Sequence, residues 1–327
     1  MVSEKQKSIV GGMTVLGITG LICKIVAVLY RIPLAWLISE QGIGTFQLVF
    51  PTYNLLLTLS SAGIPVAISR MVSYSLAQHD PRNAHRTFRV ALSALTLLGA
   101  VGTLLMVVFN GALSDRVGDP ETTMGFVAIA PALVIVCTMS AFRGFMQGQQ
   151  NMFPTAISQL IEQIGKVIIS LPLAYLGSRV GVTDPEKINI GYAAAGALLG
   201  NSIGEALALL YMMLVYRKNR PVFLRRAQDE EHMPTSHKAL MVKLFSMAVP
   251  ITLAACIVPL SAFIDSGMVV NNLMHSAGFA QEEARAMYGR YSGYVINYIN
   301  VPTAFAQAIS MSLVPAISAA MARRDWK

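Results

Sequence analysis

The chain has 327 residues, of which 54% are hydrophobic and only 13% are charged. Soluble globular proteins carry roughly 25% charged residues, so this composition excludes an ordinary soluble enzyme and indicates a polytopic membrane protein. The net charge of +8 does not indicate a nucleic-acid partner, because basic residues gather in the cytoplasmic loops of membrane proteins.

Eight apolar stretches are long enough to cross a hydrocarbon core, which takes about 20 helical residues. The expected membrane spans are residues 8–38, 44–71, 90–113, 124–142, 153–176, 190–215, 240–264 and 291–321. Sixteen Lys and Arg residues fall in the segments on one side of these spans, and five fall on the other side. By the positive-inside rule, the sequence predicts a multi-pass protein of the cell membrane with a cytoplasmic N-terminus.

The end of the sequence partly repeats its beginning. IPLAWLIS at 32–39 resembles VPLSAFID at 258–265, and GIPVAIS at 63–69 resembles LVPAIS at 313–318. Parallel repeats of this kind occur in transporters built of two helix bundles. We therefore expect a six-helix lobe over 1–216, a basic cytoplasmic linker over 217–238, and the incomplete start of a second lobe over 239–327. Prolines free backbone carbonyls in such helices, and the expected hinges are Pro33, Pro65, Pro259 and Pro315.

Two cations lie within the first expected span. Charged residues in a span are costly and usually face a cavity or a partner. Lys24 and Arg31 are seven residues apart, so they share one helix face, and no acid in that span neutralises them. They predict a hydrated cavity that accepts an anion. Alternatively, Arg31 reaches toward the membrane surface and Lys24 pairs with an acid such as Glu205.

A second group of polar residues lies in the fourth and fifth spans and the connection between them. Glu162 and Lys166 are four residues apart in the order that favours a helical ion pair. This pair is either structural or opens to hold a substrate, and the nearby amides suit either sugars and phosphates or an ordinary hydrated loop. The full set of expected substrate-binding residues is Lys24, Arg31, Asn54, Arg143, Gln147, Gln159, Gln163 and Lys166.

The sequence carries no motif for nucleotide hydrolysis or for acyl transfer, and its five histidines have no metal-ligand spacing. We therefore expect a protein that is not an enzyme and that uses no cofactor or metal. Transport would draw on an ion gradient, the membrane potential or the substrate gradient. The candidates for ion coupling are Glu162 and Glu205, the acids well inside the spans.

Three segments resemble one family of membrane transporters. They are YRIPLAWLISEQGIGTFQLVFPTYNLLLTLSSAGIPVAISRMVS at 30–73, RGFMQGQQNMFPTAISQLIEQIGKV at 143–167 and VPTAFAQAISMSLVPAISAAMARR at 301–324. The chain resembles the stage V sporulation protein B group of polysaccharide exporters. That group belongs to the multidrug/oligosaccharidyl-lipid/polysaccharide (MOP) superfamily, with the lipid II flippases of the MviN type.

The resemblance implies an all-α, MOP/MATE-like fold with two six-helix lobes around a central cavity. It also implies alternating access and an undecaprenyl-pyrophosphate-linked saccharide as substrate, with membrane lipids around the protein. The family runs to 12–14 spans, so this chain would hold one lobe and the first two helices of the next.

Lipid II flippases draw their cavity arginines from spans 1, 2 and 8. Here Leu56 and Leu57 occupy that stretch of span 2, and Asn297 lies about where the span 8 arginine would be. The particular lipid-linked glycan therefore stays open. So do two other functions, a cation-coupled multidrug exporter of the same superfamily and a non-transporting membrane scaffold that recruits cell-envelope synthesis enzymes.

Overall fold

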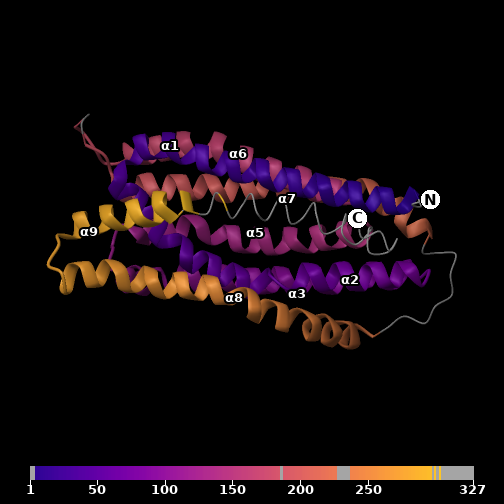
Figure 1. The fold of residues 1–327 in the computed structure, drawn as a ribbon. Coiled ribbons are helices and arrows are strands. Elements are labelled where there is room, and N and C mark those ends of the chain that lie inside the picture. Colours follow the sequence, from indigo (N-terminus) through magenta and orange to yellow (C-terminus); the bar gives the residue numbers. More distant parts are fainter. Residues whose placement is uncertain (1–3, 185–186, 227–235, 297, 300–301, 303–327) are drawn as a thin grey trace, which may run out of the picture.

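A computed structural model describes residues 4–184, 187–226, 236–296, 298–299 and 302 of the chain. Within these ranges all the regular elements are helices (Figure 1). They are α1 (Glu4–Ser61), α2 (Ile64–Ala77), α3 (Pro81–Val108), α4 (Asn110–Val117), α5 (Thr122–Gly148), α6 (Phe153–Ser178), α7 (Ile190–Arg226), α8 (His237–His275), α9 (Gln281–Tyr288) and the π-helix η1 (Gly289–Val295).

Within the described residues, six stretches of helix are long and apolar enough to cross a membrane. They are Val15–Ala77, Pro81–Val108, Thr122–Gly148, Phe153–Ser178, Ile190–Arg220 and His237–His275. The first stretch covers residues 15–38 of the first expected span and the whole of the second, and the next five overlap the third to seventh. Most of the expected eighth span, 291–321, lies outside the described residues. The predicted class, an all-α polytopic membrane protein, is confirmed.

The long helix α1 consists of two limbs that meet at Ser39. The φ angle of Ser39 is 64° and its ψ angle is 173°, which lies outside the helical region. A helix cannot continue through such a residue, so the chain turns back there. The limbs end up side by side, since Arg31 on the first and Gln47 on the second bond to neighbouring residues of η1. This break separates the first two expected spans.

Glycines on α7 bring α6 and α7 into close contact. A Cβ atom added at Gly200 would meet the backbone of Ser170, and one added at Gly204 would lie 2.7 Å from the backbone nitrogen of Lys166. Small residues at four-residue spacing allow this kind of approach in membrane helices. The close approach at these glycines also places Lys166 beside the helix that carries Glu205.

The first bundle, α1–α7, is followed by a segment that begins with α8. The helix α7 continues to Arg226, so the start of the expected 217–238 linker is helical. Arg and Lys are good helix formers, which explains why the basic residues extend the helix. The chain then crosses the length of the bundle as α8 and returns through α9 and η1, which lie against α1 (Figure 1).

Candidate functional site

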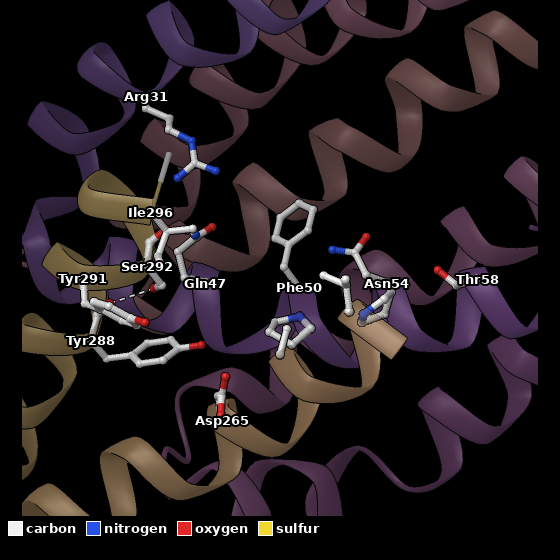
Figure 2. Close-up of a pocket in the computed structure, with 14 residues that line it drawn as sticks. Arg31, Gln47, Phe50, Asn54, Thr58, Asp265, Tyr288, Tyr291, Ser292 and Ile296 are labelled. Carbon is white, nitrogen blue, oxygen red and sulfur yellow. Dashed lines mark hydrogen bonds between the residues drawn. The ribbon is translucent and has the colours of Figure 1, made fainter. Parts of the chain in front are cut away.

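A cavity of about 540 Å³ lies between the second limb of α1, the middle of α8 and the segment formed by the end of α9 and η1 (Figure 2). Its wall combines a cation, a carboxylate, amides, hydroxyls and aromatic rings. The residues concerned include Arg31, Gln47, Phe50, Asn54, Asp265, Tyr288, Tyr291 and Ser292. A concave site with a few convergent polar groups and aromatic walls is typical of small-ligand binding.

Arg31 and Gln47 connect this cavity to η1. The Arg31 Nη1 donates to the carbonyl oxygen of Gly293 at 2.6 Å, and the Gln47 Nε2 donates to the carbonyl oxygen of Ser292 at 2.8 Å. π-Helical turns occur frequently at functional sites. The close approach is possible because Gly44 lies on the contact face, where a Cβ atom would collide with the backbone of Arg285.

A second, smaller chamber of about 70 Å³ adjoins the cavity and shares Arg31, Gln47 and Phe50 with it. Lys166 also lines this chamber. The Lys166 Nζ lies 5.3 Å from the ring centroid of Phe50 and 5.7 Å from that of Tyr30, within cation–π range. Among the described residues, no acidic side chain lines the chamber. The structure thus brings the cations Arg31 and Lys166 together at this chamber.

Lys24 is placed differently from Arg31. The buried face of the first limb of α1 is marked by Cys23 and Tyr30, which are 9% and 3% exposed. Lys24 and Arg31 each lie one residue further along, about 100° around the helix. The returning segment covers Arg31 but Lys24 is exposed and lines neither chamber. Lys24 and Arg31 thus lie on the same side of the first limb of α1, and Arg31 is the one of the two that lines the cavity.

Glu162 pairs across helices rather than along its own helix. Its Oε2 accepts from the Nη2 of Arg143 at 2.9 Å, and the Arg143 Nε donates to Ser158 at 2.9 Å. The expected ion pair between Glu162 and Lys166 is not formed, because α5 places a guanidinium closer to the carboxylate. Arg143 and Glu162 therefore join α5 to α6.

Glu205 is buried in the first bundle, with 4% of its surface exposed. Its Oε1 accepts from the Tyr53 hydroxyl at 3.1 Å and from the Asn201 Nδ2 at 2.8 Å. Its Oε2 is buried and has no hydrogen-bond partner among the described residues. Lys166 interacts with it electrostatically. A carboxylate with neutral hydrogen-bond partners and one free oxygen is suited to bind a proton or a small cation.

The expected amides fall in different places. Asn54 is exposed and lines the larger cavity. Gln159 and Gln163 are half-buried on α6, and the Oε1 atom of each is buried without a hydrogen-bond partner in the described part of the chain. Gln147 is half-buried near the end of α5. The last three line neither chamber, so Asn54 is the expected amide that the structure brings to the cavity.

The expected hinge prolines occupy three kinds of position. Pro33 and Pro259 lie inside α1 and α8, whose helices continue through them. Pro65 lies in the first turn of α2, directly after the break between α1 and α2. Pro315 lies outside the described residues. Pro259 also lines the larger cavity, and whether any of these prolines acts as a hinge stays a prediction.

Several lining residues were not expected from the sequence. Tyr288, Tyr291 and Ser292 reach the cavity because α9 and η1 return toward α1 after α8. Sequence patterns predict this return poorly, because α9 is a short, polar helix that hydropathy does not mark. Among the described residues, no group of three or more His, Cys, Asp or Glu side chains could hold a metal ion.

These features define a class of protein: a membrane-embedded helix bundle with a cation-lined cavity between its first helices and the segment that follows them. The solved structure of an inward-facing multidrug resistance MATE family transporter of the MOP superfamily shares this fold. It has a TM-score of 0.64 and 15% sequence identity, and the match covers 99% of this chain and 64% of that one.

The chain belongs to the polysaccharide biosynthesis protein family, whose sequence pattern matches residues 9–321. It is 30% identical to stage V sporulation protein B of Bacillus subtilis (strain 168), over 98% of this chain and 60% of that protein. It is 27% identical to the lipid II flippase MurJ of the same organism, over 97% of this chain and 59% of that protein. The chain thus spans about 60% of the length of these curated relatives.

Proposed function

We propose that the chain forms part of a flippase that moves an isoprenoid pyrophosphate-linked saccharide across the cell membrane by alternating access. Residues 1–216 would form the first lobe, and 239–327 would begin the second. The name of one relative, a lipid II flippase, and the family description support a lipid-linked saccharide as substrate and a transporter rather than an enzyme.

The observation that carries this proposal is the pair of cations at the adjoining chambers. Arg31 and Lys166 reach the same small chamber, and no acidic side chain of the described part of the chain lines it. Guanidinium and ammonium groups are the usual protein partners of phosphate oxygens. We infer that the pyrophosphate binds between these two side chains, and that Arg31 exchanges the Gly293 carbonyl oxygen for a phosphate oxygen when it does.

The larger cavity suits the saccharide. Asn54 and Gln47 offer amides, and the rings of Phe50 and Tyr291 offer flat apolar walls. Amides form hydrogen bonds with sugar hydroxyls, and aromatic rings pack against the apolar faces of sugar rings. The cavity therefore offers partners for both the polar and the apolar surfaces of a glycan. The prenyl chain would stay in the surrounding lipid.

The test is binding of the lipid-linked saccharide to the full chain, measured by native mass spectrometry on wild type, Arg31→Gln and Lys166→Gln. Each substitution removes one charge-assisted contact, worth roughly 1.5–3 kcal/mol. We therefore expect binding to weaken about ten- to a hundred-fold. Unchanged binding in both variants would reject the assigned site.

Two further variants sharpen the comparison. Lys24→Gln removes a cation from the same helix limb but outside both chambers, and Lys187→Gln removes an exposed cation near the start of α7. We expect both to bind like wild type. If Lys24→Gln lost as much binding as Arg31→Gln, the binding site would instead include both Lys24 and Arg31, as helical spacing alone predicts.

Cation-coupled export of drugs is a second candidate, and the buried Glu205 is the observation that favours it. Its free Oε2 and neutral partners Tyr53 and Asn201 suit a proton or cation that binds and leaves during transport. Glu162 is less suited, because it is already paired with Arg143. Drug accumulation in cells that express wild type or Glu205→Gln would separate this function from glycan transport, which should leave drug levels unaffected.

A further inference from the structure

The start of α3 and the end of α7 lie at the end of the bundle where α1 begins (Figure 1), and the His85–Tyr216 contact joins these two segments, both of which are rich in basic residues. We call this surface the basic rim. It consists of Arg82, Arg86 and Arg89 in the first turns of α3, and of Arg217, Lys218 and Arg220 toward the end of α7. All are exposed except Arg86, which is half-buried.

An aromatic contact holds the two segments of the rim together. The His85 Nε2 lies 2.7 Å from the Tyr216 hydroxyl, and the two rings are stacked with an interplanar angle of 9°. The ring of Phe88 packs beside Tyr216 at 4.9 Å between centroids. Arg89 and Arg220 both act electrostatically on this His85–Tyr216 pair. The fold thus concentrates positive charge over a rigid aromatic base.

The rim has little negative charge of its own. In residues 80–93 and 213–220, Asp80 is the sole acid, and its Oδ1 accepts from the backbone nitrogen of Asn83, where it caps α3. The Arg86 Nε is buried and has no hydrogen-bond partner in the described ranges. Like charges held together in this way repel one another unless an anion lies between them.

Exposed apolar stripes follow the rim along both helices. On α3, Leu97 and Val101 are 66% and 47% exposed and continue the face of Arg89, from which the exposed, polar Ser93 separates them. On α7, Leu214 is 55% exposed and lies one turn before Lys218. Residues four apart share one helix face. Each stripe therefore offers a surface for an acyl chain that ends at a cation.

We propose that the basic rim is a binding site for the headgroups of anionic phospholipids, separate from the transport cavity. Clusters of four to eight basic residues next to membrane helices attract anionic lipids through their surface charge. The phosphodiester would lie between Arg89 and Arg220, with Arg86 beneath it, while the acyl chains follow the apolar stripes of α3 and α7. The bound lipid would relieve the repulsion across the His85–Tyr216 contact.

The test is retention of phosphatidylglycerol against phosphatidylcholine by the full purified chain, measured by native mass spectrometry. Wild type should retain phosphatidylglycerol preferentially. The Arg89→Gln/Arg220→Gln variant should lose that preference by about thirty-fold, since each basic residue near a charged surface contributes a factor of about five. Because exposed charges are screened, the preference should also shrink as salt rises from roughly 50 to 500 mM.

The matched control is Arg179→Gln/Lys187→Gln, which removes two exposed charges at the opposite end of α6 and α7. It should keep the preference, and a Lys218→Gln/Arg217→Gln variant should lose it. Equal retention of both lipids by wild type would overturn the proposal, and so would an equal loss in the control. Displacement of phosphatidylglycerol by millimolar inorganic phosphate would overturn it in favour of a soluble anion.

Discussion

The segment after the first bundle is attached to that bundle at two ends, and the two attachments differ in kind. At the end near α9, the Arg285 Nη2 donates to the Asp119 Oδ1 at 2.6 Å, and the Thr45 hydroxyl donates to the Asp119 Oδ2 at 2.8 Å. At the end near the start of α8, Leu240, Leu244 and other apolar side chains pack in one buried cluster with α2. One attachment is a buried ion pair and the other is apolar packing.

The two kinds of attachment differ in how the following segment can separate from the first bundle. A buried ion pair is directional, and loss of either partner leaves an uncompensated charge in a dry place. Apolar packing is graded, and helices can slide against each other with smaller losses. Under the proposed alternating access, the two ends would open one at a time, and we expect that substitutions can weaken each end independently.

The largest expected effect is at the ion pair. Asp119 and Arg285 have side-chain exposures of 0% and 7%, so Asp119→Asn should leave a buried guanidinium without its counter-charge. Breaking such a pair costs about 3–5 kcal/mol. We expect a loss of this size in the free energy of unfolding, measured by SDS titration in mixed micelles. Adding Arg285→Met to Asp119→Asn should recover part of the lost stability. A change near zero in Asp119→Asn alone would show that the ion pair does not stabilise the fold.

An intermediate effect is expected at the apolar end. A Cβ atom at Gly63 would collide with the carbonyl oxygen of Ala248, so Gly63→Val should push α2 away from α8. Overpacking of this kind costs about 1–3 kcal/mol. The same SDS titration measures it, with Gly111→Val as the control, because a Cβ atom there meets nothing within 4 Å. Equal losses at the two glycines would show that the α2–α8 contact is not responsible.

The smallest effect is expected at an exposed ion pair on the α9 side. The Arg290 Nη2 lies 2.6 Å from the Glu40 Oε2, but the two side chains are 62% and 49% exposed. Exposed pairs contribute about 0–1 kcal/mol, since water and salt screen them. Arg290→Gln should therefore change the free energy of unfolding by less than about 1 kcal/mol. A loss as large as that in Asp119→Asn would mean that burial does not separate the two pairs.

Much of the fold follows from local sequence. Apolar stretches mark the helices because a membrane-crossing helix must be apolar over its whole length, and the described helices match seven of the eight expected spans. Helical spacing also places Lys24 and Arg31 on one flank of α1. It says nothing about which part of that flank another helix will cover, and η1 covers Arg31.

The partners of the charged residues come from far along the chain. Arg31 bonds to a residue 262 positions away, and Asp119 pairs with a residue 166 positions away. The expected partner of Glu162 was Lys166 on the same helix, but Arg143 on α5 takes that place. Local spacing favours the near partner, and helix packing decides whether a distant one is closer.

The sequence by itself determined that this is a polytopic helical membrane protein of a recognisable transporter family, because hydropathy and short motifs are local properties. Only the tertiary structure decided that Lys166 joins Arg31 at the smaller chamber, that Glu205 keeps one oxygen without a hydrogen-bond partner among the described residues, and that Asp119 and Arg285 connect the first bundle to α9. These arrangements depend on how helices distant in sequence rotate and approach one another, and packing of the whole bundle sets that.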